Sequence, residues 1–343
     1  MKSTKKTIVD FLNKAFLPFG KNSKNTTKVY AAKLVQASSH NFYVENISNK
    51  ADRLHDRIEE SYEECFGESY ICCIENLRRF LRLGLCTVAI DITHEDFFGA
   101  IEGFDIFPVN KDGKTGEFRY AVLSLVNKAE TEKFPVYAVP FRLGQDLAKT
   151  IEQLLDVASK LLIRIRLALL DRWFYSAEVI GLLNKRLKYL ILVPQWDIFK
   201  CMLKQLKAEN RVIAYIEHEL ILRKDFSKFR VKTKLILINN KEDFDWVFAT
   251  NLPNDKALYY IITYKQRWQI ETNFRVRDEA KIRSRSRFMQ VRYFYFLVSL
   301  LLHAIWIVKI RKQGFSFSVF LHYLDRMLFC EELSIDYVYV GDG

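Results

Sequence analysis

Three residues near position 270 carry side chains whose types and spacing suit phosphate chemistry. Tyr264, Arg267 and Glu271 fall at positions i, i+3 and i+7, which places them on one face of an α-helix. A phenol, a guanidinium and a carboxylate on one face can hold a metal ion and the phosphate group bound to it. The sequence therefore predicts that this helix forms part of a site for phosphate chemistry.

Two aspartates farther upstream can complete such a site. Asp91 follows the apolar run 86–90 and Asp171 follows the apolar run 167–170, so both are expected at the ends of buried strands. These carboxylates can meet Glu271 in space although all three are far apart in the sequence. Magnesium prefers oxygen ligands, and phosphodiester cleavage uses two such ions about 4 Å apart. The three acidic residues therefore predict a magnesium-dependent phosphodiester chemistry.

Each carboxylate also has a simpler interpretation. Asp91 could be a turn residue, Asp171 could pair with Arg172, and Glu271 could pair with a basic neighbour on a solvated helix face. Their order within a recognisable series of strands and helices favours the catalytic interpretation, because carboxylates with perturbed pKa values cluster at active sites.

The elements that must position these residues alternate between strands and helices. We expect a strand at 86–92, a turn-rich stretch at 111–116, a hairpin of 118–126 and 134–139 with 128–133 as its turn, a helix at 145–161, a strand at 163–170, a helix capped by Ser176, and a strand at 189–193. The order β, β-hairpin, α, β, α, β is typical of a ribonuclease-H-like domain. The predicted fold class is therefore α/β, with a mixed sheet flanked by helices.

The chain is expected to divide into four parts. The predicted parts are a helical N-terminal domain at 1–85 for DNA or dimer contacts, a first part of the catalytic core at 86–194, a β-rich insertion at 195–255, and a second part of the core at 256–343. Strands are expected in the insertion at 212–222, 229–238 and 246–250. One long helix is expected at 256–281, followed by a buried helix at 291–310.

The composition favours a nucleic-acid partner. The 343 residues carry a formal net charge of +12, and half of them are hydrophobic, which indicates a packed globular protein with a polyanionic partner. Nucleic acid is the first choice and an anionic membrane surface the second. The densest basic run is expected to contact the DNA backbone, and it comprises Arg275, Arg277, Lys281, Arg283, Arg285, Arg287 and Arg292.

The cysteines and the apolar segments favour a cytoplasmic location. The six cysteines form no CxxC pair and lie among apolar residues, so reduced core thiols are expected. The N-terminus has no apolar core of a secretory signal. The apolar run 293–308 is shorter than the roughly 20 residues that a bilayer requires and contains His303. We therefore expect a buried core helix and no membrane partner.

The ordered set of motifs resembles the DDE transposases of the insertion-sequence-four superfamily. Their signature helix reads Tyr, two residues, Arg, three residues, Glu, six residues, Lys, and Tyr264, Arg267 and Glu271 match it. Asp278 stands at the Lys position, which is a departure from the pattern. The segments 89–93, 169–176 and 248–252 resemble the two aspartate motifs and the Thr-Asn stretch before the signature helix, so the similarity covers about 86–310.

The resemblance implies a role for each matching residue. Asp91, Asp171 and Glu271 would bind two Mg²⁺ ions, which Mn²⁺ can replace, while Tyr264 and Arg267 would position the phosphate. Water would nick the transposon end, and the freed 3′-hydroxyl would attack the opposite strand and later the target DNA. The partners would be double-stranded DNA, as terminal repeats and target, and a second copy of the chain in a synaptic homodimer, nucleoid-associated when bound to DNA.

Four further residues have roles that the resemblance leaves open. Either Arg275 or Lys281 would take over the phosphate contact of the missing lysine. Some relatives stack a flipped base on a tryptophan of the insertion, and Trp196 and Trp246 are the candidates here.

Three other functions remain alternatives at this point. The chain could be a catalytically inactive DNA-binding relative, for which Asp278 leaves room, or a ribonuclease-H-like nuclease without a role in transposition. It could also be anchored to a membrane by 293–308. The intact carboxylates and the β-rich insertion favour the active transposase.

Overall fold

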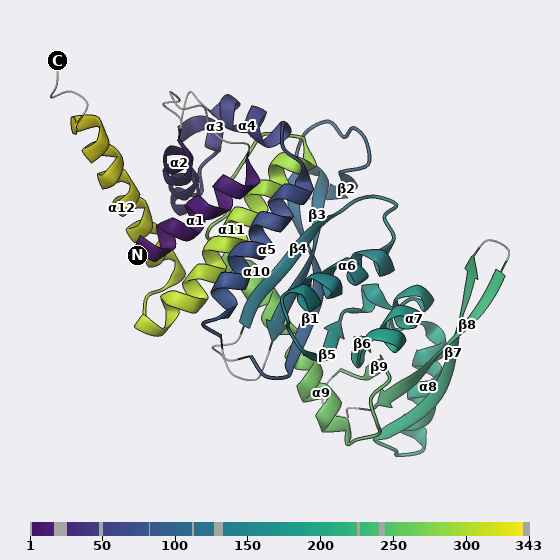
Figure 1. Ribbon diagram of the computed structural model, residues 1–343. Coiled ribbons are helices and arrows are strands. Elements are labelled where there is room, and N and C mark those ends of the chain that lie inside the picture. Colours follow the sequence, from purple (N-terminus) through teal and green to yellow (C-terminus); the bar gives the residue numbers. More distant parts are fainter. Residues whose placement is uncertain are drawn as a thin grey trace.

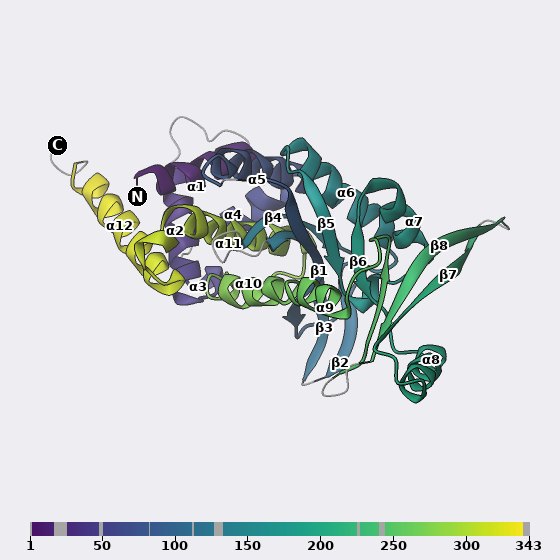
Figure 2. The same ribbon diagram turned by 90° about the horizontal axis from the view of Figure 1, so that it is seen from below.

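A computed structural model describes residues 2–16, 26–47, 51–81, 83–111, 113–126, 133–224, 227–239 and 244–338. The expected turn at 128–133 lies outside these ranges except for its last residue. A mixed sheet crosses the molecule, with one group of helices on one face and a second group on the other (Figures 1 and 2).

The helices form two groups around the sheet. Those of the first group pack with the N-terminal helices or with the C-terminal part of the chain (Figure 1). Those of the second pack against strands of the sheet. The first group comprises α1 (Lys2–Ala15), α2 (Thr27–His40), α3 (Val44–Ile47), α4 (Ala51–Glu59), α5 (Glu63–Arg78), α10 (Trp268–Asp278), α11 (Met289–Lys309) and α12 (Phe317–Val338). The second comprises α6 (Leu147–Lys160), α7 (Ala177–Arg186) and α8 (Asp197–Ala208).

Within the described ranges, nine strands form one continuous sheet. They are β1 (Cys86–Phe97), β2 (Phe107–Lys111), β3 (Lys114–Val126), β4 (Lys133–Phe141), β5 (Ile165–Leu170), β6 (Tyr189–Leu192), β7 (Ile213–Lys224), β8 (Ser227–Ile238) and β9 (Trp246–Thr250). Their order is β2-β3-β1-β5-β6-β9-β8-β7, with β4 also pairing with β3.

The centre of this sheet has the strand order of a ribonuclease-H-like fold. In the series β4-β3-β1-β5-β6, the pairs β3/β4 and β1/β3 are antiparallel, whereas β1/β5 and β5/β6 are parallel. The parallel pairs need crossover helices, which α6 and α7 supply. Ser176 caps α7 as expected, since its hydroxyl accepts a hydrogen bond from the backbone N–H of Val179 at 3.3 Å. The predicted fold class is confirmed.

The first strand is longer than the sequence predicted. It was expected to end at position 92, but β1 continues to Phe97 because β3 is equally extended and pairs with it as far as Gly116. Asp91 therefore lies within β1. It still lies at an edge of the parallel part of the sheet, because β5 ends beside Ile90.

The segment predicted as a β-rich insertion contributes to the central sheet. Its strand β9 pairs with β6 of the core on one side and with β8 on the other. The segment also contains α8, which was not expected. The β7–β8 hairpin projects beyond the body of the molecule (Figure 2), so the three strands extend the sheet instead of forming a separate layer.

The long helix expected at 256–281 is interrupted. It consists of α9 (Ala257–Lys265) and α10, with a tight turn between them, in which the N–H of Arg267 donates to the carbonyl of Tyr264 at 2.8 Å. The backbone of Arg267 remains helical, at φ −57° and ψ −37°. The chain direction is therefore kept across the junction, and the predicted spacing of the side chains survives the break.

Helix α11 is the centre of the helical layer. It is long and apolar enough to cross a membrane, but 94% of its most apolar 18-residue window is buried inside the molecule. It packs against α5 and β4 (Figure 1), and burial lowers the pKa of His303 to about 3. The expected core helix is therefore confirmed. The helices at 1–85 share its hydrophobic cluster, so they pack on the core without a separate interior.

Candidate functional site

The two predicted aspartates occupy equivalent places on adjacent parallel strands. Ile90 of β1 and Leu170 of β5 are the last residues paired between these strands, and Asp91 and Asp171 follow them directly. Because β5 ends there, its neighbour β1 has no strand partner on that side beyond Ile90. The parallel register therefore brings two carboxylates to one point at the edge of the parallel sheet.

Arg267 joins two of the three predicted carboxylates. Its Nη1 donates to Oδ2 of Asp91 at 2.7 Å, and its Nη2 donates to Oε1 of Glu271 at 2.7 Å. The guanidinium is only 7% exposed, whereas the Glu271 side chain is 56% exposed. A buried cation thus lies between an almost buried carboxylate of the sheet and a solvent-facing carboxylate of α10.

Tyr264 brings the third carboxylate into the same group. Its hydroxyl donates to Oδ1 of Asp171 at 3.4 Å, and its ring lies 5.6 Å from the guanidinium carbon of Arg267. The ring itself is fixed by contacts with Phe248 and Trp246 of β9. The structure therefore brings together all five residues that the sequence placed at the site of chemistry.

The charges of these residues depend on one another. Burial raises the pKa of Asp91 to about 6, and the carboxylates of Asp171 and Glu271 add to this rise. Arg267 and the backbone N–H of Ile92, which donates to Asp91 at 2.8 Å, act in the opposite direction. Burial would lower the pKa of Arg267, but Tyr264 and the three carboxylates raise it above its ordinary value. The guanidinium therefore stays charged, while Asp91 gains a proton in mild acid.

This donor set suits a divalent cation. Asp91, Asp171 and Glu271 offer only carboxylate oxygens, the ligands that magnesium prefers. A cation already fits between Asp91 and Glu271, because the guanidinium of Arg267 lies there. Their oxygens suit the magnesium that the sequence predicts, although these three residues are not among the described groups whose ligand atoms all lie within 4.8 Å of one another.

A different cluster has closer ligand atoms. Among the described residues, the His, Asp and Glu side chains whose ligand atoms all lie within 4.8 Å of one another are His94, Asp96 and Glu117 on β1 and β3. Lys114 already lies 2.8 Å from Asp96, and Arg119 lies 2.6 Å from Glu117. These cations pair with both carboxylates, just as Arg267 pairs with Asp91 and Glu271, so this cluster is a second candidate metal site.

The two proposed substitutes for the missing lysine lie in different surroundings. Arg275 is exposed on α10, one turn beyond Glu271. Lys281 is half-buried beyond the end of that helix, and its charge lowers the pKa of Asp96 to a smaller extent than Lys114 does. Arg275 is therefore the better placed of the two for a contact beside Glu271.

One member of the basic run is buried, so its prediction as a DNA contact was wrong, and a second member is half-buried. Arg277 is only 1% exposed, with Nη1 3.8 Å from Glu95 and its guanidinium carbon 4.4 Å from the ring of Phe296. Arg292 donates to the backbone carbonyl of Ser286 at 2.8 Å. Arg277 therefore faces the interior, whereas Arg292 is half-buried over the rings of Phe97 and Phe118. The exposed members of the run are Arg275, Arg283, Arg285 and Arg287.

The tryptophans of the insertion differ from their expected role. Trp246 is 5% exposed and stacks on Phe248, so it cannot receive a base, and that interpretation was wrong. Trp196 is half-exposed, but it stacks on Phe199 at 5.8 Å. Its outer surface alone is open to solvent.

Trp173 was missed by the sequence reasoning. It lies in the short η2 helix (Arg172–Phe174) that follows Asp171 and is 47% exposed. Its ring meets the edge of Phe141 at 5.6 Å, and the guanidinium carbon of Arg119 lies 5.6 Å from it. A large aromatic residue two positions after the strand-end carboxylate Asp171 was the available signal.

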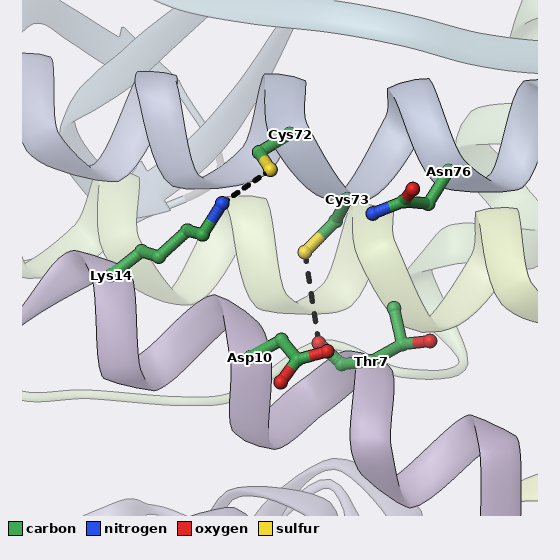
Figure 3. Close-up of a pocket in the computed structure, with 6 residues that line it drawn as sticks. All are labelled: Thr7, Asp10, Lys14, Cys72, Cys73 and Asn76. Atoms are coloured by element: carbon green, nitrogen blue, oxygen red, sulfur yellow. Dashed lines mark hydrogen bonds between the residues drawn. The ribbon is translucent and has the colours of Figure 1, made fainter.

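A hollow between α1 and α5 is unrelated to these residues. It is lined by Thr7, Asp10, Lys14, Cys72, Cys73 and Asn76 (Figure 3). Lys14 donates to the Cys72 thiol, and burial raises the pKa of Cys73 to about 12. None of the residues predicted to do chemistry lines this hollow.

Comparison with known proteins supports the fold. No protein-family model matches the sequence, and no curated protein matches it. Among solved structures, the chain is similar to a piggyBac transposase in a synaptic complex with hairpin DNA, with a TM-score of 0.55 and 12% identity. The match covers 95% of this chain and 77% of that one. At this identity the likeness concerns the fold, and the chain has a transposase-like, ribonuclease-H-like fold.

Proposed function

We propose that this chain is a DNA transposase that cuts and rejoins transposon ends, with Asp91, Asp171 and Glu271 as its catalytic carboxylates. The observation that carries the proposal is the convergence of these residues with Arg267 and Tyr264. Their side chains come from two strands and a helix that are far apart in the sequence. The transposase-like fold adds support, because this convergence lies at the edge of its parallel strands.

The proposed chemistry is hydrolysis and transfer of phosphodiester bonds. Two magnesium ions, or manganese in their place, held by the three carboxylates would supply an activated nucleophile and a stabilised leaving oxygen. Asp91 would be ionised at neutral pH, because its pKa of about 6 lies below 7. Glu271 is the most exposed of the three and would be the carboxylate that DNA approaches.

Arg267 and Tyr264 would hold the DNA phosphate in place. A guanidinium binds phosphate through paired N–H donors, and Arg267 remains charged in this setting. Tyr264 would act mainly through Asp171, since its hydroxyl donates to that carboxylate and burial raises the pKa of the phenol. Tyr264 would therefore orient Asp171 as a neutral phenol that donates a hydrogen bond to the carboxylate.

The DNA would run along the exposed basic residues beyond Glu271. Arg275, Arg283, Arg285 and Arg287 are all exposed, and contacts of this kind position DNA without reading its sequence. We propose that the substrates are the terminal repeats of a transposon and a target duplex. Two copies of the chain would meet in the synaptic complex, in the cytoplasm and at the nucleoid.

Cleavage of DNA under magnesium tests this function. The full chain is incubated with a duplex carrying the terminal repeat of its own element and with a scrambled duplex. The variants Asp91→Asn, Asp171→Asn and Glu271→Gln are measured beside it. Glu279→Gln is the matched control, because it changes an exposed carboxylate just beyond the last turn of the same helix.

We expect the native chain and the control to cut at the repeat boundary, and the three variants to bind DNA without cutting it. Equal cutting of the scrambled duplex would instead indicate a ribonuclease-H-like nuclease. Binding without cutting under magnesium and under manganese would indicate an inactive DNA-binding relative, with Asp278 as the first position to suspect.

A further inference from the structure

Arg267 lies between two of the carboxylates that the proposed function assigns to the metal ions. Its two terminal nitrogens lie 2.7 Å from Oδ2 of Asp91 and 2.7 Å from Oε1 of Glu271. A divalent ion shared by these carboxylates would need oxygens that Arg267 now engages. The guanidinium and the ion therefore compete for the same ligands.

Without a cation, this arrangement of carboxylates would be unfavourable. Asp91 is largely buried, and the charges of Asp171 and Glu271 add to the cost of ionising it. A buried carboxylate without a partner is strongly destabilising, and an adjacent cation offsets part of that cost. Arg267 provides that positive charge from within the chain, at the junction of α9 and α10.

We infer that Arg267 is the internal counter-ion of the metal-free carboxylates and is displaced from Asp91 and Glu271 when divalent ions bind. The inference rests on the proposed function, because it takes these carboxylates as the metal ligands. Displacement leaves a charged guanidinium, with its donors unpaired, beside the metal site. A DNA phosphate is a suitable new partner for it, so metal loading and phosphate capture become linked steps.

Competition with the ion and simple positioning predict opposite effects of removing Arg267. If Arg267 held Asp91 and Glu271 in the geometry that metal binding needs, removing it would weaken the binding of a divalent ion. If Arg267 competes with the ion, removing it strengthens the binding. Manganese affinity of the DNA-free protein therefore separates the two roles without any measurement of activity.

The control must separate competition from a general effect of charge. Arg172 lies next to Asp171, with Nε 4.0 Å from Oδ1, but it is exposed and bridges no two carboxylates. Arg172→Gln removes one positive charge near the carboxylates, as Arg267→Gln does. Only the second variant also frees the oxygens of Asp91 and Glu271.

The experiment measures Mn²⁺ binding to the full chain by electron paramagnetic resonance, at one pH and ionic strength. We expect Arg267→Gln to bind Mn²⁺ about tenfold or more tightly than the native chain, and Arg172→Gln to change the affinity by less than about threefold, because its charge is exposed and screened by solvent. Arg267→Lys keeps the charge but cannot bridge two carboxylates, so we expect an intermediate gain in Mn²⁺ affinity. This variant tests the inference if Arg267→Gln fails to fold.

Two results would overturn the inference. One is unchanged or weaker Mn²⁺ binding by both Arg267 variants, and the other is an equal gain in Arg172→Gln. Asp91→Asn distinguishes this failure from a failure of the proposed function. If Asp91→Asn binds Mn²⁺ as tightly as the native chain, the carboxylates are not the metal site, and both proposals fall together.

Discussion

The guanidinium of Arg267 and the carboxylate of Asp91 are 2.7 Å apart, although 176 positions separate these residues in the chain. The contact joins the junction of α9 and α10, which follows β9 in the chain, to β1. The other two predicted carboxylates are tied to this pair, Glu271 through Arg267 and Asp171 through Tyr264. The contact therefore defines the centre from which the expected effects of mutation follow.

Asp91 predicts a pH dependence of stability in the metal-free protein. The ordinary pKa of an aspartate side chain is 3.8, whereas the pKa of Asp91 in the folded chain is about 6, so the folded state holds this proton more tightly than the unfolded state. This contribution to stability is complete below pH 3.8 and is lost as the pH rises through 6.

Chemical unfolding of the native chain and of Asp91→Asn, both in a chelator, measures this effect. The native free energy of unfolding should fall relative to that of the variant by on the order of 3 kcal/mol between about pH 4 and pH 7, since one pKa unit corresponds to about 1.4 kcal/mol. A difference in the free energy of unfolding that stays constant with pH would show that the pKa of Asp91 is the same in the folded and unfolded chains.

Arg277 should matter for stability and not for DNA affinity. It is buried beside Glu95 and Phe296, and removing one partner of a buried ion pair costs about 3–5 kcal/mol. Arg277→Ala is therefore expected to lower the free energy of unfolding by this amount. Arg275→Ala on the exposed side of the same helix should change it by less than about 0.5 kcal/mol. Equal effects of the two substitutions in urea unfolding would refute this assignment.

The exposed arginines should account for part of the salt dependence of DNA binding. The double variant Arg275→Gln and Arg285→Gln is expected to reduce the slope of log affinity against log salt by up to about 0.9 for each phosphate that these side chains neutralise. Lys160→Gln, at the exposed end of α6, serves as control and should leave the slope unchanged. Fluorescence anisotropy at several salt concentrations gives both slopes, and identical slopes in all three proteins would place the DNA elsewhere.

Trp173 should contribute a stacking surface next to the site. Its half-exposed ring lies two residues after the strand-end carboxylate Asp171, and stacking of a base on an aromatic ring contributes about 1–3 kcal/mol. Trp173→Ala is expected to weaken binding of a duplex with an unpaired end by this amount, and Trp173→Phe to retain most of it. Anisotropy titrations compare duplexes with paired and with unpaired ends. An equal loss of affinity for both duplexes in Trp173→Ala would contradict the prediction.

Much of the site could be predicted because it follows from local rules. The apolar runs before Asp91 and Asp171 identify strands, and the parallel register then brings these carboxylates to one edge. The spacing of Tyr264, Arg267 and Glu271 needs only a helical backbone, which persists through the turn at Arg267. These inferences depend on periodicity and on the order of elements along the chain.

The errors have a common physical origin in long-range packing. Arg277 belongs to a helix that is covered by both β1 and α11, and the sequence pattern does not show which polar residues face that interior. The burial of Trp246 depends on the pairing of β9 with both β6 and β8, which only the complete sheet determines. The same pairing makes the predicted β-rich insertion continuous with the central sheet.

Anomalous diffraction from crystals of the chain with DNA and Mn²⁺ tests the central claim most directly, because it locates the ions without reference to activity. We expect manganese peaks bound by Asp91, Asp171 and Glu271, with the guanidinium of Arg267 no longer between Asp91 and Glu271. Manganese bound only at His94, Asp96 and Glu117, with Arg267 still joining Asp91 to Glu271, would contradict it.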